Sequence, residues 1–143
     1  MRTIVIILSF FVLFSCNSNS DVEEYIPLEG GIERWELVRM TGSLINSETT
    51  GDEMSWQEYY LINPDGSFFK SRQRDGVITQ ATGTHILIQE GQQVYFELTY
   101  LTGEELIASC LGNGKEILSL RNQVLFGSWN ACDGPGLEYR LVD

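Results

Sequence analysis

Turn dipeptides that end in glycine recur at short, nearly regular intervals through most of the chain. They are Asp65-Gly66, Asp75-Gly76, Glu90-Gly91, Thr102-Gly103 and Asn113-Gly114. Glycine accepts the positive φ that tight hairpin turns require, so each pair is a turn signal with a physical cause. The spacing leaves room only for short segments between turns. The pattern therefore predicts a meander of antiparallel strands.

The segments between the turns have the composition and periodicity of strands. In 92–100, Val94, Phe96, Leu98 and Tyr100 fall on one face, and no window shows a helical stripe of similar strength. We expect strands at 33–40, 56–63, 67–74, 77–88, 92–100, 105–111, 116–120, 124–130 and 137–142, with a polar loop at 41–55. Eight or nine strands joined by hairpins close most simply as an all-β, antiparallel up-and-down barrel, which removes exposed edges.

The first 16 residues have the composition of a secretion signal and not that of a strand meander. Arg2 precedes an apolar run over 4–14 that only Ser9 interrupts. This run is shorter than the ~20 residues of a membrane-spanning helix and fits a secretory signal peptide. Its end, Leu13-Phe14-Ser15-Cys16, resembles a bacterial lipobox, which implies diacylation of Cys16 and cleavage before it. We expect a lipoprotein signal peptide over 1–15; an ordinary signal peptide with an incidental cysteine is the alternative.

Charge distinguishes two further regions, a tether at 16–32 and one domain at 33–143. Residues 17–29 carry four acids and no bases, so this stretch reads as a solvated tether behind the lipidated Cys16. The whole chain has 20 Asp and Glu against 9 Lys and Arg, a net charge of −11. Such a charge repels phosphate backbones and argues against nucleic-acid binding. Its simplest role is to keep a tethered domain soluble.

Two further cysteines, Cys110 and Cys132, are expected outside the cytoplasm, where disulfides persist. A bond between them would contribute ~3 kcal/mol. In the predicted barrel they lie at one end but two strands apart, ~9.5 Å, whereas a disulfide joins Cα atoms ~4.4 to 6.8 Å apart. Bonding therefore requires the loop at 131–136 to fold inward over that end. Two separate buried thiols are the alternative.

No constellation of residues points to catalysis. His85 is the only histidine, which excludes His pairs, and it is expected to be a packed or partly solvated side chain. The sequence has no Gly-x-Ser-x-Gly elbow, Cys-x-x-Cys pair or phosphate-binding glycine loop. The adjacent Glu104 and Glu105 read as solvated surface. We expect a non-enzymatic protein without a metal or cofactor.

Four segments resemble the lipocalin-like lipoproteins of Bacteroidota. They are 35–38 (WELV), 63–68 (NPDGSF), 82–85 (TGTH) and 129–139 (WNACDGPGLEY). The resemblance implies a lipocalin-like barrel on a lipid anchor in the envelope of a Gram-negative bacterium, with the outer membrane expected. It also implies a structural pair, Trp35 under the basic Arg140. Glu33 replaces the usual glycine, and no long helix follows the barrel before Asp143.

Two hypotheses for function follow. In the first, the barrel binds a small apolar molecule, and the pocket is lined by Tyr60, Phe68, Phe96, Leu98 and Tyr100. In the second, side chains fill the barrel, and its exterior and loops bind a protein or glycan partner. Alternating strands build a pocket or a plug equally well. The loop at 41–55 would serve as a lid in the first case and as a docking surface in the second.

Overall fold

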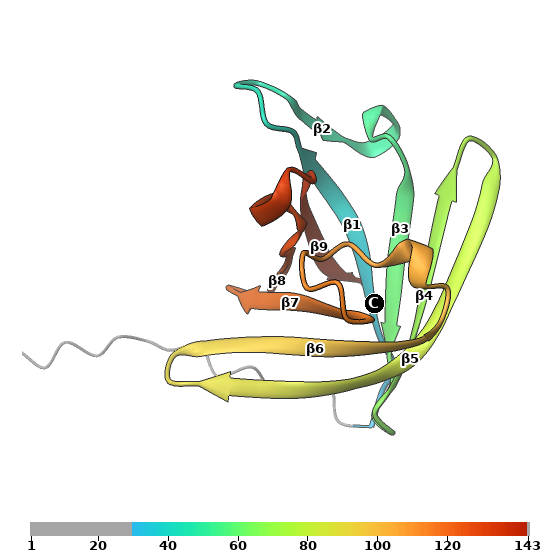
Figure 1. Cartoon of the computed structure of the whole chain (residues 1–143), viewed down its shortest axis with the longest axis vertical. Helices are drawn as coiled ribbons and strands as arrows, with labels where there is room; N and C mark the ends of the chain where they lie inside the picture. The colour runs from blue at the N-terminus through green and yellow to red at the C-terminus, as the bar shows by residue number, and fades with distance from the viewer. Residues whose placement is uncertain (1–29, 143) are drawn as a thin grey trace, which may run out of the picture.

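The computed structural model describes residues 30–142, so the predicted signal peptide, Cys16 and most of the tether lie outside the described residues. The described part is all-β, with three short 3-10 helices (Figure 1). The strands are β1 (Glu33–Thr41), β2 (Glu48–Thr50), β3 (Gln57–Ile62), β4 (Ser67–Arg74), β5 (Val77–Glu90), β6 (Gln93–Thr102), β7 (Lys115–Arg121), β8 (Val124–Gly127) and β9 (Gly136–Val142). The 3-10 helices are η1 (Gly51–Glu53), η2 (Glu104–Leu106) and η3 (Trp129–Cys132).

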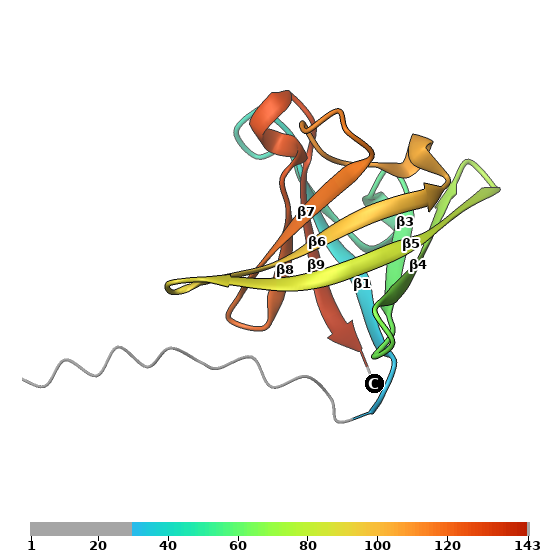
Figure 2. The ribbon, with the colours of Figure 1, turned by 60° about the horizontal axis from the view of Figure 1, so that its bottom comes forward.

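Eight of the nine strands form a closed barrel (Figure 2). From β3 to β9 each strand pairs with the next along the chain, and β1 pairs with β3 on one side and β9 on the other. The seam between β1 and β9 runs from Arg34 opposite Val142 to Thr41 opposite Gly136. β2 lies outside the closed barrel and pairs only with the C-terminal end of β1, from Arg39 to Thr41. The predicted antiparallel up-and-down barrel is confirmed, and within the described residues no helix follows β9.

Local turn chemistry sets the hairpins. Gly66 in the β3–β4 turn has φ +84°, and Gly91 in the β5–β6 turn has φ +62°, both in the left-handed region that favours glycine. In the β3–β4 turn the Asp65 carboxylate also accepts hydrogen bonds from the backbone N–H and the hydroxyl of Ser67, at 2.9 and 2.6 Å. These bonds hold the register of two strands that carry much of the candidate site.

Three predictions of local structure were wrong. The segment 105–111 is not a strand: η2 is followed by an irregular loop that crosses one end of the barrel (Figure 2). Leu106 and Ala108 are buried there, so their apolar character reflects a cap over the barrel end rather than a place in the sheet. The loop at 41–55 contains the unpredicted β2, and β8 ends at Gly127 because η3 follows it.

A disulfide joins Cys110 to Cys132 at the same end of the barrel. Neither cysteine lies on a strand: Cys110 follows the η2 cap, and Cys132 ends η3. The turn of η3 brings the two Cα atoms to 5.8 Å, which is how the chain overcomes the separation between strands. The two cysteines therefore form a disulfide and are not two separate thiols.

Candidate functional site

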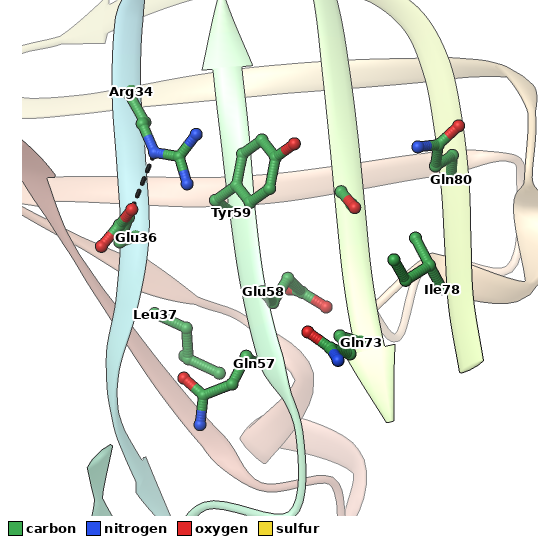
Figure 3. A pocket seen from close by; sticks show the side chains of 10 residues that line it. Arg34, Glu36, Leu37, Gln57, Glu58, Tyr59, Gln73, Ile78 and Gln80 are labelled. Atoms are coloured by element: carbon green, nitrogen blue, oxygen red, sulfur yellow. Dashed lines mark hydrogen bonds and ion pairs between the residues drawn. The ribbon is translucent and has the colours of Figure 1, made fainter. Parts of the chain in front are cut away.

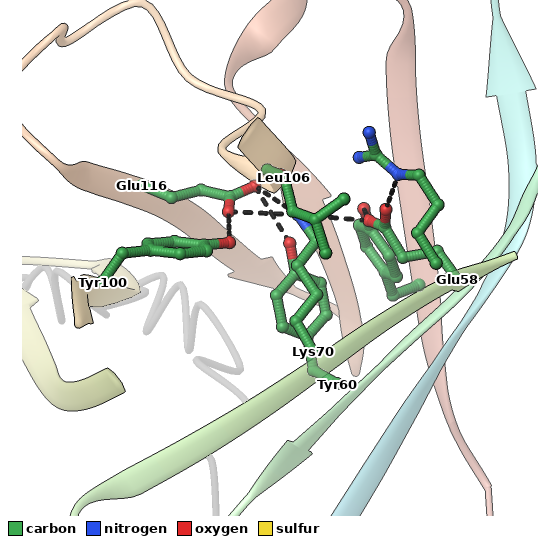
Figure 4. A network of polar contacts seen from close by, with 8 residues as sticks. Glu58, Tyr60, Lys70, Tyr100, Leu106 and Glu116 are labelled. Carbon is green, nitrogen blue, oxygen red and sulfur yellow. Dashed lines mark hydrogen bonds and ion pairs between the residues drawn. The ribbon is translucent and has the colours of Figure 1, made fainter. Parts of the chain in front are cut away.

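The middle of the barrel holds a buried ionic cluster (Figure 4). Lys70 of β4 donates a hydrogen bond from Nζ to the carbonyl oxygen of Leu106, at 2.7 Å. The same nitrogen lies 3.3 Å from Glu58 Oε1 and 3.2 Å from Glu116 Oε2, and all three side chains are fully buried. Arg72 binds the other oxygen of Glu58. Two cations and two carboxylates thus compensate one another inside the barrel.

Three tyrosines complete this cluster. Tyr60 donates to Glu116 at 2.9 Å, Tyr139 donates to Glu58 at 2.6 Å, and Tyr100 donates to the second oxygen of Glu116. Burial raises the pKa of all three hydroxyls, and the neighbouring carboxylates raise it further. Each hydroxyl is therefore held as a neutral donor. The two carboxylates already have buried partners and do not need a ligand to compensate them. The role of the cluster is therefore structural: it fills the barrel and fixes the positions of its side chains.

The five residues predicted to line a pocket pack around this cluster. Their exposed fractions are 0% for Tyr60 and Leu98, 2% for Phe68 and Phe96, and 5% for Tyr100. The Phe68 and Tyr100 rings meet edge to face, with centroids 5.0 Å apart. A hollow large enough for a ligand would leave its lining accessible to water, whereas these side chains contact other protein atoms. The structure brings all five together, as part of the core.

Sequence reasoning missed the charged members of this interior, although a signal for them existed. Lys70 is two residues from the inward-facing Phe68, Glu58 two from Tyr60, and Glu116 two from Leu118. Alternation therefore places each charge on the inner face. Charged residues are almost never fully buried unless they are paired, so the phase alone was not enough to predict the cluster.

The pairing of Trp35 with Arg140 is not found. Trp35 is buried inside the barrel, where its indole N–H donates to Glu33 at 3.0 Å. Arg140 is exposed and lies opposite Glu36 in the β1–β9 register, on the outer face. Alternation along each strand separates the two side chains. His85 is partly buried: its Nε2 lies 2.9 Å from the carbonyl oxygen of Asn63, and its ring packs on Phe96.

A groove of about 340 Å³ lies on the outer face of β1, β3, β4 and β5 (Figure 3). The strand register places its side chains in two rows across the sheet. Each side chain of a row comes from a different strand. The first row is Glu36, Tyr59, Ser71 and Gln80. The second row is Gln57, Gln73 and Ile78. Arg34 completes one rim, and the buried Leu37 and Glu58 border the groove from the inner face.

The polar groups of this outer groove are mostly uncharged. Apart from the buried Glu58, its charges are Arg34 and Glu36, which pair with each other at 2.7 Å, and the Arg34 guanidinium lies 3.9 Å from the centre of the Tyr59 ring. Gln57 donates to the carbonyl oxygen of Gly51 at 2.8 Å. The side-chain amides of Gln73 and Gln80 make no hydrogen bond within the part of the chain that the structure describes.

Searches among protein-family models, curated proteins and solved structures find no match to this chain. Between residues 30 and 142 no helix has the length and apolar character needed to cross a membrane. Over the same residues no three His, Cys, Asp or Glu side chains gather in a way that could hold a metal ion. The outer groove and the filled interior are the features of residues 30–142 that bear on function.

Proposed function

We propose that this chain is a lipid-anchored envelope lipoprotein whose filled, lipocalin-like barrel acts as a binding module through its outer face. The anchor rests on the leader and on Cys16. The binding mode rests on one contrast: the predicted pocket residues are packed into the core, whereas the outer groove offers about 340 Å³ of accessible space. Ligand pockets typically have ~300 to 1,000 Å³.

The outer groove is suited to binding because its side chains stand on rigid elements. Its residues come from four neighbouring strands of one closed sheet. A site on strands is held more firmly than one on loops, so fewer side chains lose freedom when a ligand binds. The interior in turn fixes the strands that carry the groove, since Lys70 and Arg72 of β4 bind Glu58 of β3.

The competing hypothesis, a small apolar ligand inside the barrel, has less support. Such a ligand would have to displace the tyrosine side chains that now contact Lys70, Glu58 and Glu116. Separating a buried ion pair leaves charges without compensation, which costs several kcal/mol. An apolar molecule would also face tyrosine hydroxyls and carboxylates rather than an apolar wall. These costs favour recognition from outside.

The anchor and the binding mode are tested separately on the full chain, expressed in a Gram-negative host. An alkyne-labelled fatty acid should label the wild type and not Cys16→Ala, while Ser18→Ala remains labelled as the matched control. The mature lipoprotein is then studied in detergent micelles by native mass spectrometry and amide NMR after exposure to lipid extract and to a cocktail of small polar fragments. We expect fragment-induced shifts at Tyr59, Gln73 and Gln80. A discrete bound lipid with shifts at Phe96 and Leu98 would contradict the proposal.

A further inference from the structure

We infer that the outer groove binds a neutral oligosaccharide, laid across the strands along its two rows of side chains. This inference rests on the proposed function, because it assumes that the ligand binds on the outer face. It adds the chemical class of the ligand and the residues that recognise it.

The shape of the outer groove favours an elongated ligand. Neighbouring strands lie ~4.8 Å apart, so the row from Glu36 through Tyr59 and Ser71 to Gln80 covers ~14 Å across the sheet. The row of Gln57, Gln73 and Ile78 runs parallel to it, displaced by two residues along each strand. A ligand of several linked rings can contact both rows at once, whereas a single ring would reach only part of them.

The polar groups of the rows suit hydroxyl groups. A side-chain amide presents an acceptor oxygen and two N–H donors, and a hydroxyl both donates and accepts, so the two classes pair in either sense. Gln73 and Gln80 have these groups unused within the described residues, and the Gln57 amide oxygen makes no hydrogen bond there. A ligand rich in hydroxyls could therefore satisfy the groove without bringing any charge.

Apolar surface accompanies these amides. The Tyr59 ring has two ordered neighbours: the Arg34 guanidinium lies 3.9 Å from its centre, and the Phe69 ring is tilted against it with centroids 6.0 Å apart. Ile78 is 61% exposed at the other side of the groove. Sugar rings combine polar edges with C–H faces, and such faces pack on aromatic and aliphatic side chains. Because Tyr59 is already ordered by its neighbours, binding would cost little side-chain entropy.

Charge and topology argue against two other ligand classes. Arg34 and Glu36 compensate each other, so the outer groove has no spare cation for an acidic ligand. The chain carries a net charge of −11, which repels acidic polymers at longer range. Extended peptides commonly bind by adding a strand to a free sheet edge. The groove residues stand on the face of the sheet, whereas the free edge in this region is on β5 before Thr82, where β4 pairs with β5 and β6 does not. The groups on the face of the groove favour a neutral carbohydrate, and peptides are the competing class that the test includes.

The test is a titration of the mature lipoprotein in micelles with neutral hexasaccharides of glucose, mannose and N-acetylglucosamine, followed by calorimetry and amide NMR. An acidic oligogalacturonate and an unstructured peptide library are run beside them. We expect saturable binding of a neutral oligosaccharide with shifts at Tyr59, Gln73 and Gln80. The double variant Gln73→Ala/Gln80→Ala should bind about tenfold or more weakly, as the loss of two hydrogen bonds implies. Gln93→Ala, an exposed glutamine outside the groove, should bind like the wild type.

Three outcomes would overturn the inference: no neutral oligosaccharide binds at millimolar concentration, only the acidic oligomer or peptides bind, or the double variant binds sugar as well as the wild type does. Both glutamines are exposed, so unchanged thermal unfolding of the double variant will separate lost recognition from lost folding. If polar fragments still shift the groove residues while sugars do not, the carbohydrate class fails and the proposed function survives. If lipid shifts Phe96 and Leu98 instead, the proposed function itself fails.

Discussion

Lys70 and Glu116 form an ion pair of 3.2 Å across the interior of the barrel, and neither side chain reaches solvent. The pair joins β4 to β7, which are not neighbours in the sheet. It therefore braces opposite walls, as a cross-strand pair within the sheet could not. Each charge of the pair offsets the cost of burying the other. Leaving one of them buried without its partner destabilises the fold by more than the intact pair stabilises it.

Removing Lys70 should destabilise the domain strongly. In Lys70→Met the carboxylates of Glu58 and Glu116 lose their shared cation while remaining buried, which we expect to cost ~3 to 5 kcal/mol. Urea unfolding followed by circular dichroism measures the change. Adding Glu116→Gln to Lys70→Met should recover part of the loss, since one uncompensated charge is gone. Equal stability of Lys70→Met and the wild type would show that no such pair forms.

Alkaline pH should reveal the three buried tyrosines. Their folded pKa values are raised above the ordinary value near 10, first by burial and then by Glu116 or Glu58. The stability that they contribute is fully present below pH ~10 and is lost as the pH rises above it, because only the unfolded chain can then ionise them. Tyrosinate absorbance should appear in two phases, with the second coincident with loss of circular dichroism. A single phase in a folded protein would contradict this.

The β3–β4 turn should weaken in acid. Hydrogen bonds from the hydroxyl and the backbone N–H of Ser67 lower the pKa of Asp65 below its ordinary value. The contribution of Asp65 is therefore present above pH ~3.9 and is lost as the pH falls through the folded pKa. Thermal melting of Asp65→Ala and wild type should differ at neutral pH and converge in acid. Ser67→Ala, which removes one of the donors, should show a smaller difference, and a gap independent of pH would refute the assignment.

The disulfide should matter for stability but not for the outer groove. Replacing Cys110 and Cys132 with serine opens a loop of 22 residues, which should cost ~3 kcal/mol. Ligand binding in the groove should be unchanged, because none of its lining residues belongs to η2, η3 or the loop that carries Cys110. Unfolding with and without reductant gives the first result, and the sugar titration gives the second. A double variant as stable as the oxidised wild type would refute the expected contribution.

Local signals predicted the fold well, and signals that depend on distant residues did not. Gly66 and Gly91 specify their turns through their own backbone, and the alternation of Phe96 and Leu98 follows from the pleat of one strand. Leu106 and Ala108 look the same in sequence as strand residues, yet they cap the barrel because of where the chain crosses it. Their role is set by tertiary packing.

The candidate site was harder to predict for the same reason. The row of Glu36, Tyr59, Ser71 and Gln80 exists only when four strands are in register, and no pattern along the chain links its members. The interior residues were chosen for apolar character, which correctly selected the core. It could not distinguish a hollow core from one filled by Lys70 and its carboxylates, since the same alternation builds both.

The seam between β1 and β9 has a consequence for the order of folding. β1 pairs with β9, the last strand of the barrel. The barrel can therefore close only after β9 has been made and Arg34 lies opposite Val142. A chain still being made has two open edges, and contacts between such distant residues form slowly. We therefore expect the domain to fold only after β9 has been made. A chain shortened before β9 should aggregate rather than form a smaller barrel.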